Sequence, residues 1–278
     1  MLERQPYKLY MEPGLSDSCL IVGWAKDGGR IGSKLVEYLA RELRGHCFAE
    51  IEPVDFFPLG GVTVEDDVAE FPEARFYCCR DSNLVLFHGD LPACEWHRYL
   101  DSILEVAQQY CNAREIYTVG GMFSLSPHTA PRQMFAIAGS PDMKQYLSRY
   151  GLAGDFDHDT PPGQRPTLSS FLLWEANRRG VAGAGLWTSV PFYLAAVEDP
   201  AACRKPLEFL NTRFKLGIDF SELDAEIARV NDLLARVRST DPEVDGYVQK
   251  LESNLALAEQ ELEALAAKIE DYFKRERL

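Results

Sequence analysis

The chain has 278 residues, of which 46% are hydrophobic and 26% are charged, and this ordinary globular composition leaves enough chain to bury a sizeable core. Its formal net charge is −14, and residues 219–278 alone carry 15 acidic against 8 basic side chains. Because phosphate-bearing surfaces attract the opposite charge, nucleic acid and anionic membranes are excluded as expected partners.

The seven cysteines show no C-x-x-C pair and no regular spacing, which is typical of reduced thiols in a cytosolic protein. The first residues lack the basic start and apolar stretch of a signal peptide. The longest apolar runs fall well short of the roughly 18 residues that a membrane-spanning helix requires. We therefore expect a soluble, cytoplasmic protein.

Short apolar runs alternate with helical patterns along residues 1–218. Strands are predicted at 18–24, 46–52, 75–79, 83–90, 114–119, 134–138 and 182–191. Helices are predicted at 31–43, 92–110, from 140 onward, 169–180 and 200–215. Residues 151–168 are rich in Gly and Pro and predict a long loop. The alternation predicts a three-layer α/β domain over 1–218, with a mostly parallel sheet between helices.

The pattern changes after residue 218. Apolar residues spaced by three and four predict a helix at 221–238, Pro242 interrupts it, and a heptad repeat predicts a second helix at 243–275. The two would form an antiparallel, coiled-coil-like hairpin domain over 219–278. Because the second helix is nearly twice as long, the far part of its seam needs another surface, either a second subunit or the α/β domain. That part comprises Leu262, Leu265, Ile269, Tyr272 and Phe273.

A glycine-rich turn, "GWAKDGGRIGSK" (23–34), joins the first strand to the first helix and contains Asp27, Gly28 and Gly29. Such a turn can hold an anion on backbone N–H groups. It matches neither the Walker pattern nor the dinucleotide-binding pattern, so a tight structural turn and a ligand site both remain open. The acidic stretch 155–159 departs from a calcium loop, which favours a solvated loop.

The stretch "GGMFSLSPHTAPRQ" (120–133) places Gly120 and Gly121 at a predicted strand end, followed by His128 and Arg132 between two prolines. Proline restricts the backbone on both sides, so the loop is stiff. A stiff loop suits a preformed binding site and equally a fixed subunit contact. No nucleophile elbow or zinc-protease motif is present, and we predict no catalytic residue, metal or cofactor.

Four stretches of the chain together resemble the second type of the proteasome assembly chaperone family. They are "LIVGWAKDGGRIGSKLVEYL", "LVLFHGDLPACEWHRYLDSILEVA", "TVGGMFSLSPHTAPRQMFA" and "GLWTSVPFYLAAVEDPAA", the last of which contains Tyr193. The resemblance implies a fold like that of nucleoside phosphorylases and hydrolases, homo-oligomers such as trimers, and no established catalytic residues. Eukaryotic and archaeal members help proteasome subunits to assemble.

Two hypotheses follow for the function. The first is a non-enzymatic scaffold that acts as a homo-oligomer on protein clients, proteasome subunits among them. Docking through the terminal hydrophobic-Tyr-x tail of some relatives is not expected, because this chain ends in Arg-Glu-Arg-Leu. The alternative is an enzyme or binder of a small anionic or nucleoside-like ligand. In that case Asp27, Gly28, Gly29, Gly120, Gly121, His128, Arg132 and Tyr193 would line one pocket.

Overall fold

The structure is a computed structural model that describes residues 6–57, 63–65, 67–152 and 167–276. Its strands are β1 Tyr7–Leu9, β2 Cys19–Trp24, β3 His46–Ile51, β4 Thr63–Glu65, β5 Val68–Glu70, β6 Ala74–Cys79, β7 Leu84–Gly89, β8 Glu115–Ser124, β9 Met134–Ala138 and β10 Ala182–Pro191. Its α-helices are α1 Ile31–Glu42, α2 Trp96–Cys111, α3 Pro141–Ser148, α4 Leu168–Arg178, α5 Pro200–Phe214, α6 Ser221–Thr240, α7 Pro242–Glu252 and α8 Glu259–Glu276. Short 3-10 helices are η1 Gly28–Arg30, η2 Pro53–Asp55, η3 Arg80–Ser82 and η4 Phe192–Leu194.

The chain forms two compact units. The first consists of Met1–Lys26, Gly32–Gly120 and Phe135–Leu186, and the second of Asp27–Ile31, Gly121–Met134 and Trp187–Leu278. The second unit therefore takes in α5 and two short earlier segments in addition to the C-terminal helices, whereas the sequence suggested a division at residue 218. Among the described residues, none of the helices is both long enough and apolar enough to cross a membrane.

An eight-stranded sheet with the order β1-β3-β6-β7-β2-β8-β10-β9 is the centre of the fold. β2 pairs in parallel with β7 and with β8, while β1, β3, β6 and β7 pair with one another in antiparallel fashion. The predicted α/β class is confirmed, and the sheet is mixed because β6 pairs in antiparallel fashion with both β3 and β7. The β6–β7 turn is made by η3 and ends at Asn83 in the left-handed conformation.

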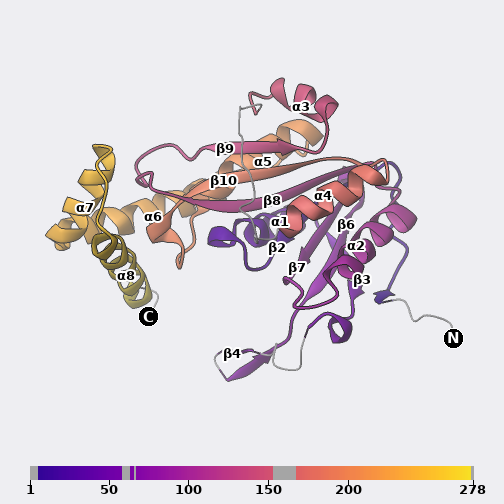
Figure 1. The fold of residues 1–278 in the computed structure, drawn as a ribbon, viewed down its shortest axis with the longest axis horizontal. Helices are drawn as coiled ribbons and strands as arrows, with labels where there is room; N and C mark the ends of the chain where they lie inside the picture. The colour runs from indigo at the N-terminus through magenta and orange to yellow at the C-terminus, as the bar shows by residue number, and fades with distance from the viewer. Residues whose placement is uncertain (1–5, 58–62, 66, 153–166, 277–278) are drawn as a thin grey trace. The chain divides into compact units, whose positions relative to one another are not determined.

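The first unit has helices on both faces of its sheet (Figure 1). Leu20, Val22 and Trp24 of β2 share an apolar cluster with buried residues of α2 and α4. The alternate residues of β2 point the other way, and a Cβ on Gly23 would overlap the backbone of Gly32 at the start of α1. Glycine is therefore required where α1 approaches the sheet, and the three-layer arrangement follows from this strand alternation.

The second unit contains the C-terminal helices, of which α6, α7 and α8 lie together (Figure 1). The single helix predicted over 243–275 is divided into α7 and α8. Asn254 takes a positive φ of 56°, which ends α7 in the manner of a left-handed helix cap. The heptad pattern continues across this break, so periodicity alone did not reveal it.

Two further helix ends differ from the sequence prediction. α2 begins at Trp96 rather than near Pro92, after Glu95 in a left-handed conformation. α4 is capped by Thr167, whose side chain accepts a hydrogen bond from the backbone N–H of Ser170. Ser169 and Ser170 lie inside the first turn of the helix.

Candidate functional site

The glycine-rich turn contacts strand β8 through its backbone, within the second unit. Asp27 Oδ2 accepts a hydrogen bond from the backbone N–H of Gly121 at 2.9 Å. A Cβ on Gly28 would overlap the Gly121 carbonyl, and one on Gly121 would overlap the Gly28 carbonyl. The two glycines are thus needed for a close crossing of two backbone segments. β8 continues through Gly120 and Gly121 to Ser124, so the glycines lie inside the strand and not at its end.

Gly29 completes this packed turn. It is buried, has a φ of 71°, and a Cβ there would lie 3.1 Å from a methyl group of Val190. An anion cradle needs backbone N–H groups directed toward an open concavity. Here the Arg30 N–H already donates to the Asp27 carbonyl at 3.1 Å. The contacts of Asp27, Gly28 and Gly29 therefore match the structural-turn interpretation.

Arg132 braces the loop that follows β8. Its guanidinium donates from Nε to Asp199 Oδ2 at 2.7 Å and from Nη2 to Asp199 Oδ1 at 3.2 Å. Its Nη1 donates to the carbonyls of His128 and Ala130 at 2.9 and 3.0 Å. The Arg132 side chain is 7% exposed and that of Asp199 is 1% exposed. This bidentate pair closes the loop onto the start of α5 and leaves little of the guanidinium for a ligand.

Tyr193, the middle residue of the 3-10 helix η4, holds His128 in place. The backbone N–H of His128 donates to Tyr193 Oη at 2.6 Å, and the ring Nδ1 lies 2.8 Å from the same oxygen. Burial lowers the pKa of His128 to about 4, and the charges of Arg238 and Arg132 act in the same direction. Burial also raises the pKa of Tyr193. At neutral pH both groups are uncharged.

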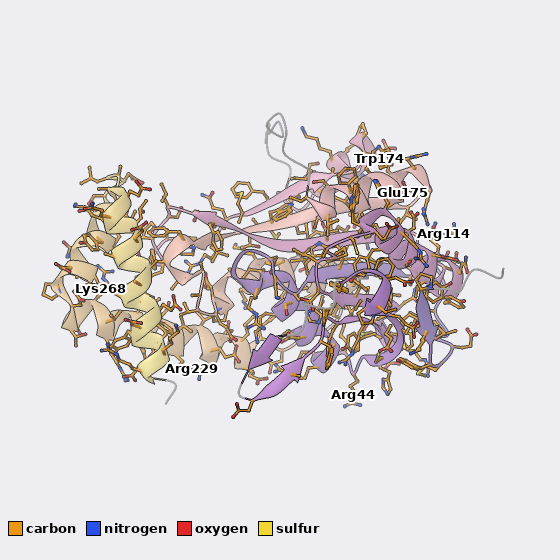
Figure 2. The ribbon with its side chains drawn as sticks, turned by 60° about the horizontal axis from the view of Figure 1, so that its bottom comes forward. Arg44, Arg114, Trp174, Glu175, Arg229 and Lys268 are labelled. Atoms are coloured by element: carbon orange, nitrogen blue, oxygen red, sulfur yellow. The ribbon has the colours of Figure 1, made fainter. Side chains whose placement is uncertain are left out.

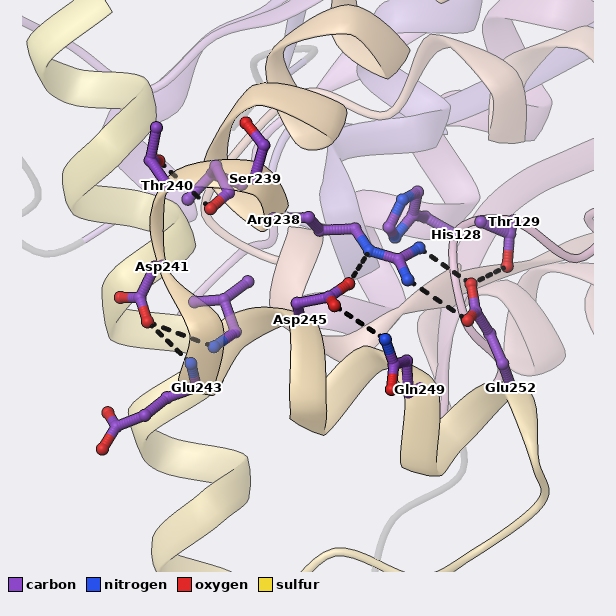
Figure 3. Close-up of polar contacts among 12 residues, drawn as sticks. His128, Thr129, Arg238, Ser239, Thr240, Asp241, Glu243, Asp245, Gln249 and Glu252 are labelled. Atoms are coloured by element: carbon purple, nitrogen blue, oxygen red, sulfur yellow. Dashed lines mark hydrogen bonds and ion pairs between the residues drawn. The ribbon is translucent and has the colours of Figure 1, made fainter.

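A second polar cluster joins this loop to α6 and α7 (Figure 3). Arg238, near the end of α6, donates from Nε to Asp245 at 2.8 Å and from Nη1 and Nη2 to Glu252 at 2.8 and 3.2 Å. Glu252 also accepts a hydrogen bond from the Thr129 hydroxyl at 2.9 Å. The hydrogen bonds from Arg238 are the main cause of the lowered pKa of Glu252.

A groove of about 610 Å³ lies beside this cluster, within the second unit. It is lined by His128, Thr129, Asn231, Ala235, Arg238, Ser239 and Asp245. The α6 residues in this set follow the spacing of one helix face. Of the eight residues predicted to line a ligand pocket, only His128 lines this groove. Apart from Thr129 in the same loop, its other lining residues come from the C-terminal helices, where the sequence analysis looked only for apolar contacts.

A model of the PAC2 family matches residues 20–238. The chain belongs to the PAC2 family. Among the curated proteins, a search finds no match. Solved structures with this fold include the Mycobacterium tuberculosis protein of unknown function Rv2714, with a TM-score of 0.74 and 22% identity over 91% of this chain and 89% of that one.

Two further solved structures have the same PAC2-type fold. One is the proteasome-assembly chaperone homologue Rv2125 of Mycobacterium tuberculosis, with a TM-score of 0.67 and 19% identity over 83% of this chain and 99% of that one. The other is PbaB of Pyrococcus furiosus, an archaeal proteasome activator, with a TM-score of 0.66 and 22% identity over 84% of this chain and 100% of that one. At these identities, the similarity establishes the fold of the chain.

The far part of the apolar seam, which was predicted to need a second subunit or the α/β domain, lies largely inside this PAC2 chain. Leu265, Ile269 and Phe273 of α8 are buried, while Leu262 and Tyr272 are partly exposed. α8 packs against η4 and also contacts α6 and α7. The three buried residues are therefore core residues of the second unit and are not available at its surface. The break between α7 and α8 makes this possible, because it lets α8 change direction.

A serine and a histidine also meet in the first unit. Ser33 Oγ donates to Glu37 at 2.9 Å and lies 3.1 Å from His88 Nε2. In a catalytic triad the histidine accepts the serine proton, with a carboxylate on the far side of the imidazole. Here the serine lies between the other two groups, and it is 1% exposed. The arrangement is a partly buried hydrogen-bond chain at the start of α1, with an exposed glutamate at one end.

No metal centre is found among the residues that the structure describes, since no three of their His, Cys, Asp or Glu side chains gather as metal ligands. The acidic stretch of Asp155, Asp157, His158 and Asp159 lies outside those residues. Sequence analysis missed Asp199, Asn231, Arg238 and Glu252. Asp199 lies just before α5 and the other three belong to ordinary helical patterns, and only the fold brings them to the loop that contains His128.

Proposed function

We propose that this protein is a non-enzymatic scaffold that acts as a homo-oligomer, a trimer, in the assembly of other proteins. The observation that carries the proposal is that the loop containing His128 and Arg132 forms its hydrogen bonds within the chain itself. Arg132 makes four hydrogen bonds to Asp199, His128 and Ala130, and His128 is tied to Tyr193. A group that binds or transforms a substrate must reach it directly. These groups instead hold the loop in one conformation.

Membership of the PAC2 family supports protein clients. The relatives described as a proteasome-assembly chaperone homologue and a proteasome activator make proteasome subunits the first clients to test. The proposed trimer rests on the family resemblance. The apolar residues of α8 do not support it, because Leu265, Ile269 and Phe273 are buried within their own chain. The net charge of −14 supports a protein that binds neither nucleic acid nor anionic membrane, and the seven free cysteines support a cytoplasmic one.

The alternative of an enzyme acting through the glycine turn, His128 and Arg132 is less well supported. The glycine turn is packed on β8, and Arg132 is neutralised by Asp199. Of the eight residues of the proposed pocket, His128 alone lines the groove beside α6. The hydroxyls that line the groove are engaged within the chain, Thr129 with Glu252 and Ser239 with the Arg236 carbonyl, and the Asp245 carboxylate is paired with Arg238.

The proposal is tested by reconstitution with purified proteasome subunits from the same organism. Native mass spectrometry follows the rate and the yield of subunit assembly with and without the protein. We expect a complex between the chain and unassembled subunits, and faster assembly. Light scattering on the chain alone is expected to give the mass of a trimer. Turnover of a small molecule, or a folded protein that neither binds subunits nor changes their assembly, would contradict the proposal.

A further inference from the structure

The groove beside His128 has the size of a ligand site. Its volume of about 610 Å³ falls within the range of roughly 300–1,000 Å³ that small-molecule sites occupy. One wall is the face of α6 that carries Asn231, Ala235, Arg238 and Ser239, and the other includes His128 and Thr129 of the loop after β8. Because Arg132 and Tyr193 hold that loop in place, the groove is preformed.

The contacts of His128 favour one assignment of its ring proton. The backbone N–H of His128 already donates to Tyr193 Oη, and we assign the tyrosine hydrogen to the contact with Nδ1. Nδ1 is then an acceptor, and the neutral imidazole carries its hydrogen on Nε2. Within the described part of the chain, no partner is found for Nε2. His128 therefore offers a fixed N–H donor where it lines the groove.

Asn231 supplies the matching group on α6. It is exposed, it lines the groove, and its carboxamide has no hydrogen-bond partner among the residues that the structure describes. A carboxamide both donates and accepts hydrogen bonds. Together, His128 and Asn231 can bind hydroxyl, carbonyl or amide groups of one ligand.

The charges around the groove disfavour an anion. The guanidinium of Arg238 is already shared by two carboxylates, those of Asp245 and Glu252. Three of its N–H groups are used in this way, and the three side chains together carry a net negative charge. The groove thus resembles an anion site in having arginine and histidine, but it lacks the excess positive charge that would hold a phosphate.

We propose that this groove binds a small, uncharged ligand rich in hydroxyl, carbonyl or amide groups, through His128 Nε2–H and the Asn231 carboxamide, and that it discriminates against phosphorylated forms. The inference goes beyond the scaffold role and does not depend on it. A scaffold that assembles proteins could carry such a site for regulation, and its loss would leave client binding as a separate measurement.

The test uses paired probes that differ by one phosphate group. Isothermal titration and saturation-transfer NMR would measure the binding of uridine against uridine monophosphate, and of glucose against glucose 6-phosphate, at up to millimolar concentration. We expect a neutral member to bind, and its phosphorylated partner to bind at least about tenfold more weakly, because the added negative charge faces two carboxylates. Equal or tighter binding of the phosphorylated member would overturn the proposal, as would no binding of either neutral probe.

Matched variants test whether the ligand binds at His128 and Asn231. Asn231→Ala removes the carboxamide, and His128→Asn keeps an acceptor for the Tyr193 hydroxyl while removing the Nε2–H donor. Each is expected to weaken binding of the neutral probe by about fivefold or more. Arg229→Ala, on the same helix but outside the groove (Figure 2), is the control and should change nothing. Unchanged binding in both groove variants would overturn the assignment of the site, whereas the assembly assay tests the scaffold role independently.

Discussion

The two units of the molecule are stabilised in different ways. In the first unit the sheet and its helices enclose a nearly continuous apolar cluster, with aromatic rings such as Phe76 and Phe87 only 4.8 Å apart between centroids. In the second unit, ion pairs and polar hydrogen bonds connect many of the elements. They include the buried Arg132–Asp199 pair, the Arg238 cluster, and Lys268 (Figure 2), which binds both Asp241 and Glu243 at 2.7 Å.

This contrast shows that polar contacts determine the conformation of the loop that contains His128 and Arg132. An apolar core tolerates many sequences, because burial depends mainly on volume and pattern. A buried ion pair depends on both partners, since either charge alone is costly in the interior. The second unit should therefore be more sensitive than the first to single changes of charge. The predictions that follow test this difference, beginning with the largest expected effect.

The buried pair gives the largest expected effect. Asp199→Ala leaves the Arg132 charge buried without its partner and should lower the free energy of unfolding by about 3–5 kcal/mol. In the first unit, Arg114→Ala breaks a largely exposed pair with Asp17 and should cost less than about 1 kcal/mol. Urea denaturation of both variants measures the difference. Similar losses for the two variants would remove the contrast between the units.

The apolar seam of α8 gives the next effect. Ile269→Ala creates a cavity in the second unit and should lower the free energy of unfolding by about 2–5 kcal/mol. Because Ile269 is buried in its own chain, light scattering should give the same oligomeric mass as for the wild type. Dissociation of the oligomer without a loss of thermal stability would instead place Ile269 at a subunit contact.

His128 makes the stability of the second unit depend on pH. Its pKa lies near 4 in the folded chain and near 6.5 when exposed, so the unfolded chain binds the extra proton between these values. As the pH falls from 6.5 to 4, the wild type should lose up to about 3 kcal/mol that His128→Asn does not lose. Parallel urea titrations at several pH values check this. Identical pH profiles would show that the imidazole is not desolvated.

Two glycine variants give the smallest effects, with opposite signs. Gly121→Ala places a Cβ against the Gly28 carbonyl and should destabilise the protein by about 1–3 kcal/mol. Gly246→Ala, inside α7, meets no atom within 4 Å and should stabilise it by up to about 1 kcal/mol. Thermal melting distinguishes the two. A harmless alanine at 121 would show that the turn and β8 are farther apart than described.

The sequence was most informative where burial follows a period. The strands at 18–24 and 83–90 and the helix after residue 31 were predicted because a continuous apolar run or a four-residue spacing reflects the local surroundings. The seam of 244–272 was also recognised, but the break after α7 was not. Its signal is a single Asn at a left-handed position, which the continuing heptad pattern conceals.

The candidate site was predictable only in part. The prolines and the His–Arg pair drew attention to the loop after β8. The partners of those residues were not predictable, because Asp199 is 67 residues from Arg132, and Glu252 is 123 residues from Thr129. Nothing in a local pattern distinguishes Asp199 from any other acidic residue near a helix start. The same holds for the groove, whose α6 face looks like an ordinary solvated surface.

The central claim is that the loop after β8, which contains His128 and Arg132, has a structural role in a protein that works by binding other proteins. The most direct test is the subunit-assembly activity of the double variant Arg132→Met/Asp199→Leu, which replaces the buried pair by apolar side chains of similar size. The account predicts that this variant folds and promotes assembly as the wild type does. A variant that melts like the wild type but no longer promotes assembly would contradict it, because Arg132 would then act on a ligand or client directly.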